Sequence, residues 1–460
     1  MTDDRTERRS PHVAIVGGGL AGISAAAVLV ERGCQVELFE QSSHLGGRAW
    51  SFRDSQTGQL VDACQHVAMG CCTSLIDLCR QMGMTDCFDR CGVFHFFDRA
   101  GVRSDFGAVR WLPPPLHLLP ALARQKYLTP RERLSIACAI RRLAGPLATP
   151  EQTIGQWLRR NGQTDEAIAR FWSPIIVAAL SQPPDSASLA AARKVFVDGF
   201  LASRDAYQLL LPRLPLQELI DRRMGAWLAG KGVAIHRGAR IKQIEGDACG
   251  VSGLVLCDDS RRTFDCTIVA VAWSALRALL SDGLAAALPW LSGMENIRPA
   301  GITAVHLWHD RPLHSLPHAV LLERVGQWVF ADAAADAVGH HCQVVISASH
   351  TLASHDHNDI LATVCDDLAA VWPTTRDAKL LHHRVIAQPA AVFAVEPGLD
   401  HFRPPQQTAV ENLFLAGDWT ATGWPGTMEG AVRSGCMAAD AILARRGVAT
   451  RGIDTPAPKR

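Results

Sequence analysis

The segment 13–40 constrains the fold more than any other part of the chain. It opens with a short apolar run at 13–16, which has the character of a buried parallel strand. A turn with three regularly spaced glycines follows at once: Gly17, Gly19 and Gly22. Small residues over 23–31 then predict a helix. A strand, a glycine turn and a helix in this order are typical of a unit that binds a dinucleotide.

Each residue of this motif has a physical task. Gly17 permits the tight turn, Gly19 lets the backbone approach a pyrophosphate, and Gly22 brings helix and strand close together. A second apolar strand, 35–39, ends at Glu40, where an acidic group holds the ribose hydroxyls. The motif alone does not decide between NAD and FAD.

The continuation of the motif indicates FAD. Glu40 is followed, after five residues, by Gly46-Gly47-Arg48. This pattern resembles the extension found in the flavoprotein superfamily of amine oxidases, phytoene desaturases and protoporphyrinogen oxidases. The resemblance implies that the glycines pass close to the FAD diphosphate and that Arg48 lies near phosphate or flavin, a task suited to a guanidinium fork. The alternative is an exposed turn with a surface arginine.

A second motif near the C-terminus resembles the closing motif of the same superfamily. An apolar strand at 412–416 ends in Gly417-Asp418, and a helix is expected over 427–444. By resemblance, Asp418 would bond the ribityl or pyrophosphate part of FAD. The helix N-terminus, with Thr427 and Met428, would point at the flavin pyrimidine ring, where its dipole stabilises negative charge. Glu429 could simply favour that dipole.

These motifs predict an α/β fold in which a Rossmann-type FAD-binding domain is interleaved with an α+β substrate domain. A middle block with a helix and three strands completes the FAD-binding domain, and its backbone near Ile241 would meet the adenine. The FAD-binding domain is predicted from three segments, the substrate domain from two, with a tail at each end: 11–70, 208–285 and 405–446; 71–207 and 286–404; 1–10 and 447–460.

A further motif narrows the resemblance. The run Asp62-x-x-Gln65-His66-x-x-x-Gly70 is similar to the signature of hydroxysqualene dehydroxylases, also called squalene-associated FAD-dependent desaturases. Weaker matches extend the resemblance over 13–444. It implies removal of the hydroxyl of hydroxysqualene, with a hydride from reduced FAD, to give squalene for hopanoid synthesis. The partner molecule would be an apolar isoprenoid lipid.

Three residues of this signature are candidates for catalysis. Asp62 or His66 could protonate the leaving hydroxyl, with Gln65 orienting the donor. Histidine is the side chain most easily tuned to give up a proton near neutral pH. All three could instead brace the backbone beside the flavin. Apolar rings could line a dry cavity or belong to an ordinary core, namely those of Phe171, Trp172 and Trp424.

The sequence also departs from the family pattern. Ala63 and Cys64 stand where many relatives have Asn and Gly, and 388–392 lacks basic residues ahead of Phe393. Both changes leave the FAD motifs intact and bear on the identity of the substrate. A desaturase or oxidase of a carotenoid-like lipid, which sends hydride toward FAD, therefore stays open, as does an FAD-binding relative without activity.

Other activities are disfavoured by what the chain lacks. Only two tyrosines occur, Tyr127 and Tyr207, and no lysine lies between Lys242 and Lys379, so the flavin-side residues of an amine oxidase are missing. One dinucleotide fingerprint leaves no domain for NADPH, so an external electron donor is expected. A metal site is not expected, because Cys87, Cys91 and a nearby histidine, His95, do not make four ligands.

Charge and hydropathy bear on location. The net charge is +1, which gives no reason to expect a nucleic-acid partner. The scattered cysteines favour a cytoplasmic protein, and no long uncharged run predicts a membrane span. The Leu-rich segment 111–145 is interrupted by prolines and carries arginines. It suits either peripheral contact with anionic lipid at the inner face of a membrane or helices packed on the core.

Overall fold

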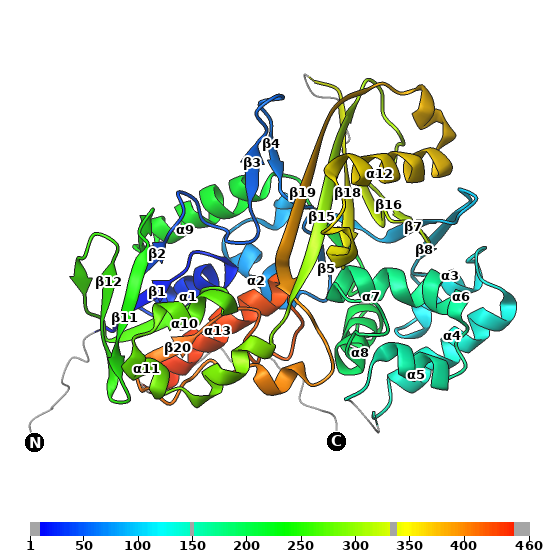
Figure 1. The fold of residues 1–460 in the computed structure, drawn as a ribbon. Coiled ribbons are helices and arrows are strands. Elements are labelled where there is room, and N and C mark those ends of the chain that lie inside the picture. The colour runs from blue at the N-terminus through cyan, green and yellow to red at the C-terminus, as the bar shows by residue number, and fades with distance from the viewer. Residues whose placement is uncertain (1–9, 148–150, 332–337, 446–460) are drawn as a thin grey trace, which may run out of the picture.

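Two large β-sheets, smaller sheets and a group of helices make up the protein, as shown by a computed structural model that describes residues 10–147, 151–331 and 338–445 (Figure 1). A five-stranded sheet lies on one side of the molecule. A seven-stranded sheet and a helical group lie on the other. The two predicted tails, apart from Ser10 at the border, fall outside the described residues.

The five-stranded sheet is parallel throughout. Its strands, in spatial order, are β10 (Ala234–Arg237), β2 (Gln35–Glu40), β1 (His12–Val16), β14 (Cys266–Val269) and β20 (Leu413–Leu415). Alternate residues of β1 face opposite layers. Val13 and Ile15 join the core with the helices α1 (Leu20–Glu31) and α13 (Met428–Arg445). Ala14 and Val16 join the core that contains Ile244. Because both faces are covered, the strand is apolar without alternation.

The second of these cores is covered by a small antiparallel sheet. Its strands are β11 (Ile241–Asp247), β12 (Gly250–Leu256) and β13 (Arg261–Arg262). Ile244 and Leu254 are wholly buried in it. We call the two sheets, with α1, α13 and the helix α9 (Gly225–Gly230), the nucleotide half.

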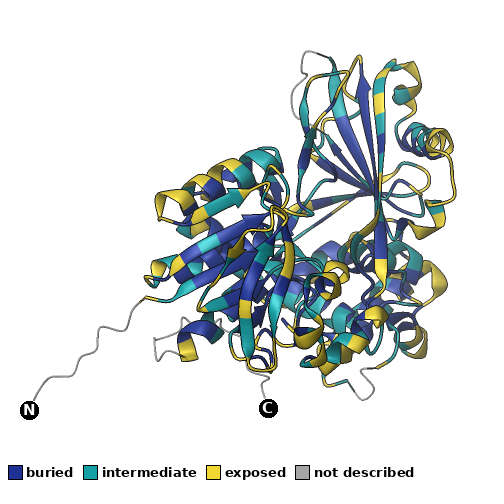
Figure 2. Ribbon diagram, turned by 60° about the vertical axis from the view of Figure 1, so that its left-hand side comes forward, coloured by how far each residue is buried: buried dark blue, intermediate teal, exposed yellow. Residues whose placement is uncertain are grey.

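The seven-stranded sheet is mixed, with one parallel pairing between β16 and β7. Its strands, in spatial order, are β19 (Leu380–Phe393), β15 (Pro299–His309), β18 (His340–Ser347), β17 (Trp328–Ala331), β16 (His318–Leu321), β7 (Val93–Phe97) and β8 (Arg103–Gly107). The helix α12 (His357–Val371) covers one face, where Val305 packs with Val364. Figure 2 shows the continuous burial along the central strands.

The opposite face of this sheet joins the core of the helical group, as Val320 and Phe330 share a cluster with Phe171 and Phe200. The helices there are α3 (Leu119–Ala123), α4 (Pro130–Leu143), α5 (Ile154–Arg160), α6 (Asp165–Ala167), α7 (Ser173–Leu180) and α8 (Leu189–Phe196). We call the seven-stranded sheet, α12 and the helical group together the sheet half.

Shorter elements connect the halves. They are β3 (Ser51–Arg53), β4 (Leu60–Asp62), β5 (Ala68–Met69), α2 (Thr73–Gln81), β6 (Phe88–Cys91), β9 (Leu209–Pro212), η5 (Gln217–Met224), α10 (Trp273–Leu279) and α11 (Asp282–Ala286). The predicted fold class is confirmed: a parallel Rossmann-type sheet is interleaved along the chain with a mixed α and β unit. None of the described helices is both long enough and apolar enough to cross a bilayer.

Candidate functional site

The glycine turn connects β1 to α1. A Cβ on Gly22 would lie 2.0 Å from the carbonyl oxygen of Gly17, so no larger residue fits there. The helix begins after Gly19, and no side chain of the described residues caps its first turn, which also lacks an acidic residue. Its first N–H groups therefore point at a site suited to a phosphate.

Glu40 stands at the end of β2 with 7% of its surface exposed. Its carboxylate accepts hydrogen bonds of 2.8 Å from the backbone N–H of Gly18 and that of Ser42, so it fixes the turn beside it. The N–H of Ala239 donates to the carbonyl oxygen of Glu40 at 2.9 Å. That bond brings buried Ile241, the first residue of β11, to the same end of the sheet.

The second glycine segment packs directly on the first. The N–H of Gly46 donates to the carbonyl oxygen of Gly18 at 2.9 Å. A Cβ on Gly47 would lie 3.3 Å from the Cα of Gly19. The two turns are thus in backbone contact, and Arg48 emerges from the end of this paired structure.

The closing motif has an equally tight geometry. Gly417 has a φ of +142°, and a Cβ there would lie 2.3 Å from Nε1 of Trp419. The buried Trp419 indole donates to the carbonyl oxygen of Val271 at 2.9 Å, while the N–H of Gly417 donates to Ser434 at 2.7 Å. The next residue, Asp418, is held with 3% of its surface exposed.

Arg48 connects the two ends of the chain. Its Nη2 donates to Oδ1 of buried Asp418, 370 residues later, and its Nη1 donates to the carbonyl oxygen of Ala391 on β19 at 3.2 Å. Its guanidinium also lies over the ring of Trp273, 5.7 Å from the ring centroid. One side chain therefore joins the two predicted FAD motifs and the edge strand of the seven-stranded sheet.

His66 lies close enough to Arg48 for its charge to act on the ring. Burial lowers the pKa of the imidazole, a hydrogen bond of 2.8 Å to the carbonyl oxygen of Cys64 opposes this, and the positive charge of Arg48 lowers the pKa further. A carbonyl only accepts, so Nδ1 carries the proton of that bond. The ring is therefore neutral near pH 7, with Nε2 as its acceptor atom.

Asp62 is held by hydrogen bonds in a different role. Its Oδ1 accepts from the hydroxyl of Ser51 at 2.6 Å and from the N–H of Leu216 at 2.8 Å. The Ser51 hydroxyl in turn accepts from the N–H of Gln217, the first residue of η5, at 2.8 Å. These contacts cap the start of that helix. Gln65, the third candidate, is half-buried between Cys64 and His66.

The N-terminus of α13 is shaped by its own residues. The hydroxyl of Thr427 accepts from the N–H of Gly430 at 3.1 Å, and half-buried Met428 begins the helix. Buried Glu429 accepts from the N–H groups of Ser74 and Leu75 at 3.1 and 2.9 Å. It therefore caps a second helix, α2, which the sequence did not indicate.

Arg403 is a further residue that sequence reasoning missed. It is buried, and its guanidinium donates to carbonyl oxygens of Asp418 at 2.8 Å and Trp424 at 2.7 Å, and to the hydroxyl of Thr422 at 3.1 Å. It thereby holds the loop that precedes α13. No local pattern identifies this role, because the loop groups that it holds lie 15 to 21 residues later and its one nearby partner, Asp400, is an exposed side chain.

The three aromatic candidates have different surroundings. Phe171 and Trp172 are buried in the helical group, and the indole N–H of Trp172 donates to Gln163 at 3.0 Å. Trp424 is half-buried beside α13, with Lys194 at 4.9 Å and Arg433 at 5.6 Å from its ring. Trp424 is therefore the one that belongs to the loop of the closing motif.

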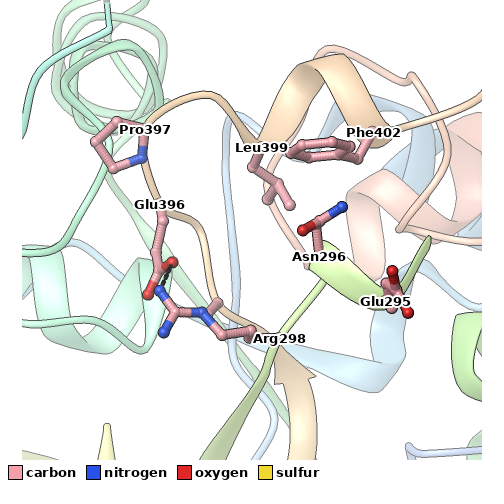
Figure 3. A pocket seen from close by; sticks show the side chains of 8 residues that line it. Glu295, Asn296, Arg298, Glu396, Pro397, Leu399 and Phe402 are labelled. Atoms are coloured by element: carbon pink, nitrogen blue, oxygen red, sulfur yellow. Dashed lines mark hydrogen bonds and ion pairs between the residues drawn. The ribbon is translucent and has the colours of Figure 1, made fainter. Parts of the chain in front are cut away.

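A hollow of about 320 Å³ opens on the surface near the end of β19. Arg298 and Glu396 form an ion pair on one side of it, and Leu399 and Phe402 line its other side (Figure 3). None of the predicted site residues lines it, so we assign it no part in the chemistry. Within the described ranges, no group of three or more histidine, cysteine or acidic residues could hold a metal ion.

Comparison with known proteins decides the family. A model of the family described as flavin containing amine oxidoreductase matches residues 20–443, nearly the whole chain. The chain belongs to this family. Its members hold a flavin, so the cofactor is FAD, and the protein is a flavin-containing oxidoreductase.

Individual relatives of this flavin family are distant. A hydroxysqualene dehydroxylase of Sinorhizobium fredii is 26% identical, with 94% of this chain and 98% of the relative aligned. The tomato (Solanum lycopersicum) 15-cis-phytoene desaturase is 24% identical over 94% of this chain and 77% of its own. A crystal structure of an oxidoreductase from Methanosarcina mazei has the same fold, with a TM-score of 0.71 at 17% identity over 94% of this chain and all of that one.

The residues described above fit FAD. The uncapped first turn of α1 suits the pyrophosphate, and the carboxylate of Glu40, at the carboxyl end of β2, would be the group to hold the ribose. A Cβ on Gly19 would come no closer than 4.0 Å to Gly47, which leaves a shallow cradle of backbone between the two turns.

Proposed function

We propose that the protein removes the hydroxyl group of hydroxysqualene to give squalene. The observation that carries this is the closeness of the segment of Arg48, from the FAD motifs, to the segment that resembles the hydroxysqualene dehydroxylase signature. The N–H of Ala63 donates to the carbonyl oxygen of Trp50 at 3.0 Å, and the charge of Arg48 acts on His66. The dehydroxylase relative, which aligns over nearly its full length, supports the same substrate.

The chemistry that FAD supplies when bound in its reduced form is a hydride, given to the substrate carbon. At that carbon the C–O bond breaks, the hydroxyl takes a proton and leaves as water, and a C–H bond forms. The protein must hold an apolar chain, deliver one proton and exclude other water. Because the described fold has a single dinucleotide site, an external electron donor is part of the proposal.

An apolar substrate suits the inner face of the seven-stranded sheet. Aromatic rings gather there about Phe94, with centroid distances of 6.0 Å to Phe200, 6.1 Å to Trp328 and 6.3 Å to Tyr207. These rings offer broad apolar surfaces and few hydrogen-bonding groups. Such apolar surfaces suit an isoprenoid chain.

His66 is proposed to act on the hydroxyl through Nε2. Its lowered pKa defines the pH dependence. If the imidazolium donates the proton, the chemical step slows as the pH rises through a midpoint below 6.5. If the neutral ring accepts a proton instead, the rate rises through the same midpoint. The direction of this profile therefore distinguishes a proton donor from a base.

The first experiment is anaerobic. The purified holoprotein is reduced with dithionite, hydroxysqualene is added, and the flavin spectrum and extracted lipid are followed. We expect flavin reoxidation with one squalene formed per flavin, slowed roughly a hundredfold by His66→Gln. His355→Gln, at an exposed histidine, is the control. Flavin that stays reduced would contradict the proposal.

A second candidate is desaturation of a carotenoid-like isoprenoid, which the phytoene desaturase relative favours. It needs oxidised flavin and a base, and the neutral His66 would serve as the acceptor. Oxidised holoprotein mixed with phytoene under argon tests this alternative. Bleaching of the flavin with formation of a new conjugated double bond would support it. An unchanged spectrum with both lipids would leave an FAD-binding protein without either activity.

A further inference from the structure

The segment 106–147 is strongly cationic in a chain whose net charge is +1. It contains seven cationic side chains: Arg110, Arg124, Lys126, Arg131, Arg133, Arg141 and Arg142. Its one carboxylate, Glu132, is buried and accepts from the N–H and hydroxyl of Thr129 at 2.7 and 2.8 Å. That carboxylate forms the capping box of α4, so it does not offset the surface charge.

Large apolar side chains are exposed in the same segment. Of the nine exposed large apolar residues described, four fall within 111–134. They are Trp111 at 78%, Leu134 at 69%, Leu116 at 46% and Leu119 at 43% exposed. Several exposed apolar side chains within one short segment indicate an interaction site more strongly than single ones scattered over the surface.

The two properties meet on α4. Arg131, Leu134, Cys138 and Arg141 recur at helical spacing and are all exposed, so they share the outward face of the helix. The buried side chains of α4, such as Ile136, face the core. The helix thus packs on the core and still presents a second face.

The C-terminal part of that face, at Cys138 and Arg141, borders a hollow of about 720 Å³. Arg141, Arg142 and Arg160 line it together with the apolar Leu147 and Trp157. Cationic and apolar groups are therefore mixed in the hollow as they are on the helix. The helices α3 and α4 stand at the end of the molecule away from the five-stranded sheet (Figure 1).

We propose that this docking segment, 110–142, binds the surface of a bilayer that contains anionic lipid. Exposed tryptophan and leucine enter the boundary between headgroups and acyl chains, while arginines pair with lipid phosphates. A second copy of the chain fits less well, because a symmetric contact through this face would bring the same cations together. The inference goes beyond the proposed reaction and does not depend on which lipid reacts.

The test is sedimentation of the flavin-loaded protein with vesicles, without substrate. We expect binding to vesicles of phosphatidylglycerol with phosphatidylcholine and much weaker binding to phosphatidylcholine alone. Raising the salt concentration should weaken it. Replacing three charges by Arg131→Gln, Arg141→Gln and Arg142→Gln should reduce binding to the anionic vesicles by roughly a hundredfold. The variant Trp111→Ser with Leu134→Ser should reduce binding to both kinds of vesicle.

Matched controls come from other faces. Lys231→Gln, Arg376→Gln and Lys379→Gln remove three exposed cations, and Leu381→Ser with Phe402→Ser removes two exposed apolar groups. These variants should bind as the wild type does. No binding to anionic vesicles, or equal loss with control and test variants, would overturn the proposal. So would a dimer in solution that only the Trp111 and Leu134 changes dissociate. An inactive protein that still binds vesicles would leave this inference intact.

Discussion

The two large sheets bury different kinds of side chain. In the five-stranded sheet the central strand is purely aliphatic inside, and the polar groups Glu40 and Asp418 come at or just after the ends of strands. In the seven-stranded sheet polar rings lie within the strands, such as His306 on β15 and His318 on β16. Within the described ranges, three of the four buried histidines lie on strands of this sheet, the third being His309 on β15.

This difference indicates which kind of change should destabilise each half. The nucleotide half depends on close contacts at its glycine turns, so positions such as Gly22 and Gly417 have no room for an added Cβ. The sheet half depends on histidines that stay neutral, so it is sensitive to acid. Burial and the neighbouring His341 lower the pKa of His306 to about 3, and burial lowers that of His318 to about 4. Both remain uncharged at any pH where the protein would be studied.

The largest effect is expected from Gly22→Ala. The added methyl group would lie 2.0 Å from the carbonyl oxygen of Gly17, so α1 and the turn must separate and the flavin site is lost. Flavin absorbance per protein after purification measures this, and we expect almost none. Gly230→Ala is the matched control, because no described atom lies within 4 Å of that Cβ. A Gly22→Ala protein that still binds flavin would show that the close contact between Gly22 and Gly17 is not required for the flavin site.

Asp418→Asn is expected to have the next largest effect. It removes the charge that Arg48 pairs with, and the carboxylate is buried while the arginine is about one-third exposed. Solvent screens the charge of the arginine, so we expect losing this ion pair to cost about 2 kcal/mol of FAD-binding free energy, or roughly thirtyfold in FAD affinity.

Titration of the apoprotein with FAD gives the affinity. Arg48→Lys keeps the charge but not the two-pronged contact with Asp418 and Ala391, so it should fall between wild type and Asp418→Asn. Unchanged FAD affinity in Asp418→Asn would mean that this bond serves the fold and not the cofactor.

The acid sensitivity of the sheet half gives the third prediction. A histidine with a native pKa below its unfolded value of about 6.5 stabilises the fold above that pH and not below it, because only the unfolded chain then takes up the proton. For His318, lowering the pH from neutral to about pH 5 reduces its contribution to the free energy of unfolding by about 2 kcal/mol.

His318→Phe tests this, because the ring is replaced among Phe94 and Trp328 without a titrating group. Urea unfolding followed by circular dichroism at both pH values gives the free energy of unfolding. The variant should lose about 2 kcal/mol less than wild type on acidification, whatever its stability at neutral pH. His355→Gln should lose as much as wild type does. An equal loss in His318→Phe would exclude His318 as a source of the acid sensitivity.

Sequence reasoning was effective where the determinants are contiguous. The glycine turn, both flanking strands and Glu40 lie within about thirty residues, so spacing alone predicts their geometry. The family resemblance added Arg48 and Asp418 separately. Their direct contact across 370 residues could not be read from spacing, because it depends on how β20 is placed in the sheet.

Other parts of the site could not be predicted for the same reason. Glu429 looked like a residue for its own helix, yet it caps α2, because the packing of two helices decides which N–H groups it meets. The buried histidines of the sheet half follow from strand pairing over long separations. The local sequence pattern predicts the helix or strand in which a residue lies, whereas tertiary packing determines which other residues it contacts.

The smallest effect is expected from Asp62→Asn, which tests whether this residue is structural or catalytic. Its Oδ1 accepts from Ser51 and from the N–H of Leu216, and an asparagine oxygen can accept both bonds without the charge. If Asp62 is structural, the substitution should lower the free energy of unfolding by about 1 kcal/mol and leave the single-turnover rate within a few-fold of the wild-type rate. If Asp62 is the proton donor, the substitution should slow that rate roughly a hundredfold or more with little loss of stability. Urea unfolding and anaerobic turnover on the same sample separate the two outcomes.

The hydrogen bonds of Asp62, which already cap the start of η5, favour the structural outcome. That outcome would leave His66 as the residue of the signature to which we assign the proton chemistry.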